Sequence, residues 1–185
     1  MDAIISLDQY ILEGLYAMRN PEAVQVLIWI TELGSTTFIG GLTISAGLVF
    51  LFRGKVAYFT GLAISVAGSA AAVYFLKELF HRARPDTIFQ AYLETGFSFP
   101  SGHAAMSLAL YGFLVWLVWR HIPQTGWRFA ALFSAALLIG VIGFSRMYLG
   151  VHHASDVLGG FLIAGMFAWL ATIATRKMLS LTGSE

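Results

Sequence analysis

The sequence predicts an all-helical protein, a polytopic bundle of five to six transmembrane helices with an amphipathic helix at its N-terminus. Of the 185 residues, 58% are hydrophobic and only 11% are charged, and the mean hydropathy is +0.75. A soluble domain carries about 25% charged residues. Several apolar stretches also approach the roughly 17 to 25 residues that a spanning helix needs. We therefore expect one integral-membrane domain over residues 1–185.

Residues 1–20 are predicted to form a helix that lies in the membrane interface. Apolar side chains recur every three or four residues from Ala3 to Met18, and Asp8 and Glu13 lie off that stripe. This pattern is typical of an interfacial amphipathic helix, although a short helix packed on the bundle would show it too. Asp2 and Asp8 stand where a cleavable signal peptide would carry basic residues, so no such peptide is expected.

The next segment, Glu22 to Glu32, follows the break at Asn20-Pro21 and is too short to span alone. We expect a re-entrant or tilted piece that joins the following segment through Gly34-Ser35. Five longer apolar segments then follow as predicted spans: Thr36 to Phe52, Val56 to Leu76, Ala104 to Trp119, Phe129 to Phe144 and Val157 to Thr175.

Basic residues between the spans predict the orientation of the chain. They gather at alternate ends, as Arg53, Lys55, Arg120, Arg128, Arg176 and Lys177. Since cytoplasmic loops carry an excess of Lys and Arg, the loops Phe80 to Pro100 and Ser145 to Asp156 should share the outer face of a plasma membrane. The net charge of +1 suggests no nucleic-acid partner, and the absence of cysteine excludes disulfide and thiolate chemistry.

The stretch from Ser145 to Asp156 keeps Arg146, His152, His153 and Asp156 between two apolar segments. Ionisable groups are costly beside hydrocarbon, so such a cluster indicates a functional site. His152 and Asp156 are four residues apart and would be neighbours on one helical face. Asp156 would then fix the tautomer of a nucleophilic His152. His153 would point off that face as an interfacial residue.

Two further patterns point to an anion. Lys77 and Arg84 are seven residues apart and would share one face if the helix continued, where they could clamp a phosphate or merely snorkel to the interface. His81 and Arg82 are read as rim residues. Pro100-Ser101-Gly102-His103 precedes an apolar helix and could present free N–H groups to a phosphate, or simply cap that helix.

Together, Lys77-x6-Arg84-Pro85, Pro100-Ser101-Gly102-His103 and Ser145-Arg146-x5-His152-x3-Asp156 resemble the three ordered motifs of the type-2 phosphatidic acid phosphatase superfamily. They cover residues 77–156. The resemblance implies a membrane lipid phosphatase in which His152 forms a phosphohistidine, His103 protonates the leaving oxygen and Asp156 supports His152. It also implies that the phosphate is held without metal or cofactor by Lys77, Arg84, Ser101, Gly102 and Arg146.

The resemblance allows several lipid substrates in the bilayer. A compact chain with an outward site looks like bacterial members that recycle a polyprenyl carrier, so undecaprenyl diphosphate is our first expectation. Phosphatidylglycerophosphate or phosphatidic acid is the alternative. Three other interpretations compete with a metal-free phosphatase: metal ligation by His103, His152, His153 and Asp156; a transporter; and a lipid-binding protein without catalysis. The sequence shows no inverted repeat typical of transporters, and both histidines of the motifs are present.

Overall fold

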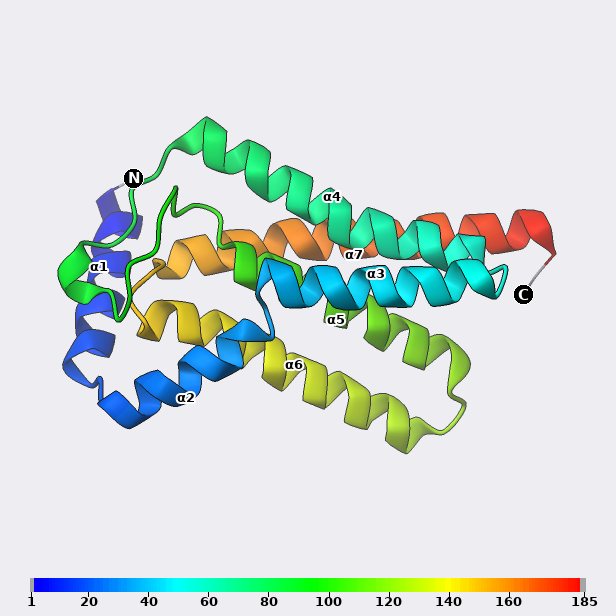
Figure 1. Cartoon of the computed structure of the whole chain (residues 1–185), viewed down its shortest axis with the longest axis horizontal. Helices are drawn as coiled ribbons and strands as arrows, with labels where there is room; N and C mark the ends of the chain where they lie inside the picture. The colour runs from blue at the N-terminus through cyan, green and yellow to red at the C-terminus, as the bar shows by residue number, and fades with distance from the viewer. Residues whose placement is uncertain (1, 184–185) are drawn as a thin grey trace.

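The computed structural model describes residues 2–183, which form helices and connecting loops without any strand (Figure 1). The elements are α1 (Asp2–Ala17), α2 (Pro21–Glu32), α3 (Thr36–Phe52), α4 (Val56–Phe80), the short 3-10 helix η1 (Thr87–Phe89), α5 (Gly102–His121), α6 (Thr125–Tyr148) and α7 (Ala154–Thr182). The predicted all-helical class is therefore confirmed.

Five helical segments of the described chain are long and apolar enough to cross a membrane. Four of them are α4, α5, α6 and α7, and each extends beyond the bounds that hydropathy alone predicted. The fifth combines α2 and α3 over Pro21–Phe52. Large apolar side chains such as Leu137, Leu162 and Trp169 are exposed along these helices, as expected for surfaces that face lipid.

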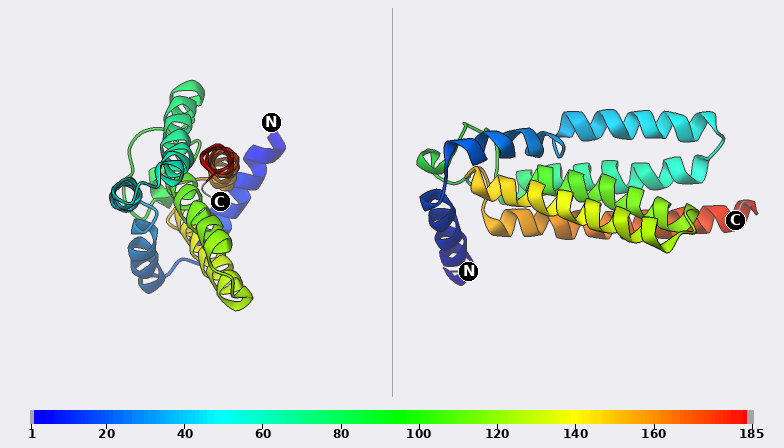
Figure 2. Two further views of the ribbon diagram at one scale, coloured as in Figure 1. Left: turned by 90° about the vertical axis from the view of Figure 1, so that its right-hand side faces the viewer. Right: turned by 90° about the horizontal axis from the view of Figure 1, so that it is seen from below.

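The chain bends between α2 and α3, where the sequence placed Gly34-Ser35 (Figure 2). The Ser35 side chain accepts a hydrogen bond from the N–H of Phe38, so it caps α3 as a new helix. Asn20 caps α2 in the same way through the N–H of Ala23. The expected tilted piece is thus a separate helix that continues into a span after a bend.

Close packing holds the motif-bearing helices together. The main core lies among α3, α4, α5 and α7, with Ile39, Leu62 and Phe113 fully or almost fully buried. Gly160 of α7 faces the segment that starts α5, because an added Cβ would lie 2.5 Å from the carbonyl oxygen of Ser101. A side chain at position 160 would therefore displace the Ser101 segment.

Both polar loops lie at one end of the bundle, and α1 runs across that end instead of along it (Figures 1 and 2). The α3–α4 and α5–α6 turns and the end of α7 lie at the opposite end. The connections that carry the basic residues and the two polar loops therefore lie at opposite ends of the bundle, as the sequence predicted. This arrangement brings residues 81–101 and 149–153 together at the end of the bundle where α1 lies.

Candidate active site

The residues of the three motifs occupy the end of the bundle that α1 covers. Lys77 lies in the last turn of α4, Arg84 in the loop after it, Ser101 directly before α5, Gly102 and His103 in the first turn of α5, Arg146 in the last turn of α6, His152 in the loop before α7, and Asp156 in the first turn of α7. Hydrogen bonds and ion pairs tie several of them to one another and to neighbouring residues.

His152 is the central side chain, and only 2% of it is exposed. Its Nε2 lies 3.2 Å from Nη1 of Arg84. Because a guanidinium only donates hydrogen bonds, Nε2 must be the accepting nitrogen and Nδ1 must carry the proton. Nδ1 lies 3.5 Å from Oδ2 of Asp156, which is long for a hydrogen bond, and it has no other partner among residues 2–183. The lone pair of His152 therefore points toward the cations.

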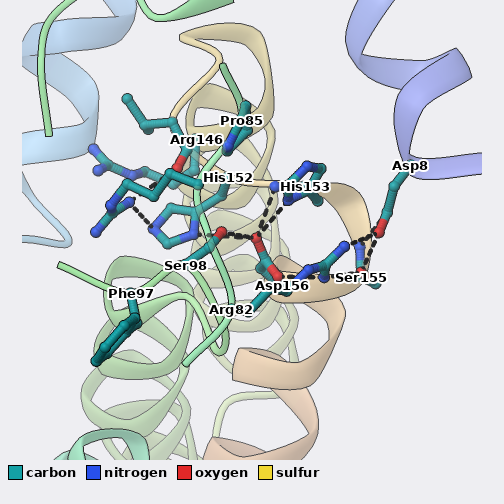
Figure 3. Close-up of polar contacts among 12 residues, drawn as sticks. Asp8, Arg82, Pro85, Phe97, Ser98, Arg146, His152, His153, Ser155 and Asp156 are labelled. Atoms are coloured by element: carbon teal, nitrogen blue, oxygen red, sulfur yellow. Dashed lines mark hydrogen bonds and ion pairs between the residues drawn. The ribbon is translucent and has the colours of Figure 1, made fainter. Parts of the chain in front are cut away.

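Asp156 is fully buried and its two oxygens have different partners (Figure 3). Oδ2 accepts hydrogen bonds from the Ser98 hydroxyl and, at 2.8 Å, from the backbone N–H of His153. Oδ1 accepts a hydrogen bond from Arg82 at 2.6 Å. The interpretation of Arg82 as a rim residue is wrong, since its guanidinium contacts the carboxylate behind His152.

His153 also differs from its predicted position. Its Nδ1 lies 3.3 Å from Oδ2 of Asp156, so this ring does not point away from the carboxylate. The reason is that α7 begins only at Ala154, with His153 as its N-cap and His152 outside the helix. The helical spacing assumed for His152 and Asp156 is therefore wrong, although the two side chains do face each other.

A tight turn, not a helix, places His152 beside Asp156. Gly150 has φ 70°, and an added Cβ would lie 1.9 Å from the carbonyl oxygen of Phe89, so only glycine fits there. The N–H groups of Val151 and His152 then both donate to the carbonyl of Arg146 at 3.2 Å. The end of α6 thereby fixes the backbone of the nucleophile candidate.

α4 does not continue to Arg84, so the condition under which Lys77 and Arg84 would share one helical face is not met. The helix ends at Phe80 because His81 adopts φ 46°, the left-handed region, and lies exposed at the rim as expected. Arg84 instead reaches back from the loop to the carbonyls of Val151 at 2.9 Å and Gly96 at 3.1 Å. Lys77 donates to the carbonyl of Phe97. Carbonyls of the loop and the turn therefore hold the two cations in place.

Arg146 is fully buried and surrounded by polar groups that sequence reasoning did not find. It donates to the Tyr92 hydroxyl at 2.6 Å and to Thr31 at 3.3 Å, and it forms an ion pair with Glu94. Burial alone would raise the pKa of Glu94, but the charges of Arg146 and Arg84 hold it below its ordinary value. Glu94 lies in a loop that has neither helical nor strand periodicity. The one feature that could have indicated its role is its acidic side chain between motifs that carry basic residues.

Two buried polar atoms near these cations have no protein partner within residues 2–183, namely Oγ of Ser101 and Nε of Arg146. Leaving a buried donor unpaired costs about 1–3 kcal/mol. Ser101 occupies the N-cap position of α5 as predicted, but its side chain makes no capping bond. Its hydroxyl and the first N–H groups of α5 thus remain available for an anion.

His103 faces a pocket of about 520 Å³ beside this cluster. The pocket is lined by Ile28, Thr31, Glu32, Ser35, Tyr92, Leu93, Glu94, Thr95 and His103. Its wall combines polar side chains from the α2–α3 bend with the loop that carries Glu94. His103 thus shares this pocket with Thr31, Tyr92 and Glu94, which contact Arg146.

The metal alternative needs a cluster of ligands, and the geometry does not supply one in the described part of the chain. Within residues 2–183, no group of three or more His, Cys, Asp or Glu side chains is arranged to hold a metal ion. Asp156 is instead occupied by Ser98, Arg82 and the backbone of His153.

The protonation of His152 gives a testable pH dependence. Burial lowers the pKa of His152 from 6.5 to about 4, and the charges of Arg146 and Arg84 act in the same direction. The folded protein therefore keeps this imidazole neutral while an unfolded chain would protonate it, so stability is lost as pH falls from 6.5 toward 4. In ¹⁵N NMR of labelled protein in detergent, the His152 ring should titrate near pH 4. A midpoint of about 6, the value of an unperturbed histidine, would contradict this assignment, and His152→Gln identifies the signal.

A buried histidine backed by a carboxylate and facing several cations is an arrangement for nucleophilic attack on an anionic group. The sequence matches the PAP2 superfamily over residues 57–179, a range that contains all three motifs. The chain belongs to the PAP2 superfamily, and it is a multi-pass membrane protein of the lipid phosphatase class.

Two curated relatives cover most of the chain. It is 31% identical over 172 residues to phosphatidylglycerophosphatase B of Bacillus subtilis, covering 91% of this chain and 83% of the relative. It is 27% identical over 175 residues to a lipid A 4'-phosphatase of Bacteroides thetaiotaomicron, covering 86% and 69%. Both relatives carry names of lipid phosphatases.

Solved structures confirm the fold. The crystal structure of a transmembrane PAP2-type phosphatidylglycerolphosphate phosphatase from Bacillus subtilis superposes with a TM-score of 0.85 at 29% identity, covering 96% of this chain and 88% of that one. Aquifex aeolicus LpxE superposes with a TM-score of 0.67 at 24% identity, covering 89% and 93%. The second likeness concerns the fold alone.

Proposed function

We propose that this protein hydrolyses the phosphate monoester of a glycerophospholipid, with phosphatidylglycerophosphate as the preferred substrate. The observation that carries the proposal is the pocket beside His103, whose lining includes the acidic side chains of Glu32 and Glu94. The relative with 31% identity, named phosphatidylglycerophosphatase B, supports the same choice. Undecaprenyl diphosphate, the first expectation from the sequence, is less well supported than this alternative.

The charge of the leaving group separates the two substrates. When undecaprenyl diphosphate is hydrolysed, the leaving group begins with a second, negatively charged phosphate. When phosphatidylglycerophosphate is hydrolysed, it begins with a neutral glycerol unit that carries a free hydroxyl. Glu32 is exposed in the pocket, and its side chain has no partner within residues 2–183. A carboxylate repels a phosphate but accepts a hydrogen bond from a hydroxyl, so the pocket favours the glycerol leaving group.

In the proposed mechanism, Nε2 of His152 attacks phosphorus, a P–N bond forms and the P–O bond to the lipid breaks. The electron pair of that bond goes to the leaving oxygen, and His103 supplies its proton. Asp156 holds the Nδ1–H side of the imidazole and stabilises the positive charge that develops there. Water then attacks the phosphohistidine with His103 as base, the P–N bond breaks and inorganic phosphate is released.

The phosphate itself would be held by the cations of Lys77, Arg84 and Arg146 and by Ser101 and Gly102 at the start of α5. Phosphoryl transfer spreads negative charge over the equatorial oxygens, so fixed positive groups there stabilise the transition state. These five residues together replace the role that a metal ion plays in other phosphatases. We propose that hydrolysis is metal-independent and takes place at the outer face of the plasma membrane.

The test is phosphate release in detergent from phosphatidylglycerophosphate, phosphatidic acid and undecaprenyl diphosphate, each measured with and without EDTA. We expect release from phosphatidylglycerophosphate to be fastest and to be unchanged by EDTA. Loss of activity with EDTA that added Mg²⁺ restores would contradict the metal-independent mechanism. Faster release from undecaprenyl diphosphate would contradict the substrate assignment.

A variant measured in the same experiment tests whether the negative charge in the pocket determines the preference between the two substrates. Glu32→Gln should raise kcat/KM for undecaprenyl diphosphate relative to phosphatidylglycerophosphate by about two- to fivefold, because an exposed charge contributes at most roughly 1 kcal/mol. Glu22→Gln is the matched control, since Glu22 is exposed in the first turn of the same helix but is not part of the pocket. An equal change of the ratio in both variants would contradict the role of the pocket.

A further inference from the structure

We propose that Asp8, on the crosswise helix α1, is a positioning residue for the catalytic pair Asp156 and His152, and that α1 is therefore part of the active site. The inference rests on the proposed function. It deepens that function by linking a helix outside the three motifs to the reaction.

Asp8 is buried, with 3% of the residue exposed, although it stands on an otherwise amphipathic helix. Its Oδ1 accepts the backbone N–H of Ser155 at 2.9 Å, and its Oδ2 accepts the Ser155 hydroxyl and, at 2.6 Å, a hydrogen bond from Nη2 of Arg82. Burial would raise the pKa of Asp8, but the hydrogen bonds from Ser155 and Arg82 bring it below its ordinary value. Asp8 is therefore an anion seated at the N-terminus of α7, where a negative charge is favourable.

Arg82 connects Asp8 to the catalytic carboxylate (Figure 3). Its Nη2 donates to Asp8, and its Nη1 donates to Oδ1 of Asp156, both at 2.6 Å. One guanidinium thus stands between two carboxylates, and Asp156 in turn faces Nδ1 of His152 at 3.5 Å. A row of polar contacts thus runs from Asp8 of α1 through Arg82 and Asp156 to His152.

The charge of Asp8 matters because it lets Arg82 interact with two carboxylates instead of with Asp156 alone. With Asp8 ionised, Arg82 is balanced by two anions, and Asp156 keeps negative charge to stabilise the imidazolium that forms when His152 attacks. Without Asp8, the full guanidinium charge would act on Asp156 and oppose that stabilisation. The effect should appear in the chemical step more than in substrate binding, because neither Asp8 nor Arg82 is among the groups assigned to the phosphate.

Attachment of α1 does not by itself explain a buried carboxylate. Leu12 of α1 is buried at 3% exposure, and Arg19, directly after the helix, donates to the carbonyl of Tyr148 at 2.6 Å. These contacts anchor the helix independently of Asp8. A buried charge is costly compared with an apolar anchor of the same size, so its presence fits a role in setting the field around Asp156.

The experiment compares Asp8→Asn, Asp8→Glu and Glu13→Gln with the wild type, using phosphatidylglycerophosphate in detergent. Asp8→Asn should lower kcat about tenfold, in the range seen when groups that orient a catalytic ligand are removed, while KM stays within about twofold. Asp8→Glu keeps the charge and should retain most of kcat. Glu13 is exposed on the same helix and, within residues 2–183, its side chain bonds only to Gln9, so Glu13→Gln should leave both constants unchanged.

A double-variant cycle tests whether Asp8 acts through Arg82. In an Arg82→Gln background, Asp8→Asn should cost less than about twofold, because coupled residues are not additive. Melting temperatures are measured for each protein, and rates are compared well below the lowest one. The inference is overturned if Asp8→Asn keeps wild-type kcat, if it changes KM alone, if Asp8→Glu loses as much as Asp8→Asn, or if the two effects add fully. Absence of any hydrolysis by the wild type would overturn the proposed function, and this inference with it.

Discussion

Replacing His152 by alanine should reduce phosphate release from phosphatidylglycerophosphate by at least about a thousandfold, because loss of a catalytic nucleophile removes the covalent route entirely. The lone pair on Nε2 faces Arg84 at 3.2 Å, on the side where the phosphate is proposed to bind. Steady-state release in detergent measures the loss. Brief incubation with ³²P-labelled substrate should also label the wild type with a base-stable, acid-labile phosphate that the variant lacks.

The matched control for this prediction is His121→Ala. His121 lies at the other end of the bundle, where its ring packs edge-on against Tyr58 with centroids 5.3 Å apart. It shares its residue type with the motif histidines but not their surroundings, so activity should be kept. If His152→Ala retained more than about a tenth of the wild-type rate, or if it still formed the labelled protein, the nucleophile would be a different residue.

Replacing His103 by alanine should produce a loss that depends on the leaving group. For a lipid alcohol, which needs a proton as it departs, we expect a loss of about 10²- to 10⁴-fold, the usual contribution of general acid catalysis. With p-nitrophenyl phosphate, the nitrophenolate departs without a proton. The variant should therefore release about one equivalent of nitrophenolate rapidly and then turn over slowly, since the attack of water still lacks its base.

Stopped-flow absorbance resolves this burst and separates the two roles of His103. The size of the burst, set against the active-enzyme concentration of the wild type, shows whether phosphohistidine formation survives. A variant that lost activity equally toward both substrates and showed no burst would place His103 in phosphate binding instead of proton transfer. His153→Ala offers a comparison within the site, because His153 contacts Asp156 but not the pocket beside His103.

The sequence predicted the fold class, the bundle and the ends at which the motifs gather, because hydropathy and basic residues respond directly to the bilayer. It also predicted that Lys77, Arg84, Ser101, His103, Arg146, His152 and Asp156 act together, because three spaced motifs recur in order. The helical geometry considered for two pairs is absent, since Arg84 lies beyond the end of α4 and His152 lies before the start of α7. α4 ends at a left-handed residue, His81, where the sequence has no glycine to predict such an end. A turn at Gly150, and not a helix, positions His152.

Contacts between distant segments account for the rest of what the sequence did not show. Asp8 and Arg82 are 74 positions apart, and Arg146 and Glu94 are 52 apart. Neither pair has a fixed spacing that local patterns could reveal. Arg82 was assigned to the rim because charged residues at a helix end usually reach solvent. Its true position depends on how α1 folds back across the bundle, which is a property of the tertiary structure.

The crosswise course of α1 has a consequence for how substrates arrive. Ile4, Ile5, Leu7 and Tyr10 are exposed on this helix, which bonds through Asp8 to Ser155 in the first turn of α7, so apolar side chains lie at the end of the bundle that carries the motifs. A helix seated at the headgroup layer would keep the reaction centre at the depth of lipid phosphates, and a lipid would arrive by sliding sideways within its leaflet. The encounter is then two-dimensional, and the rate would follow the surface density of the lipid, not its amount per volume of solution.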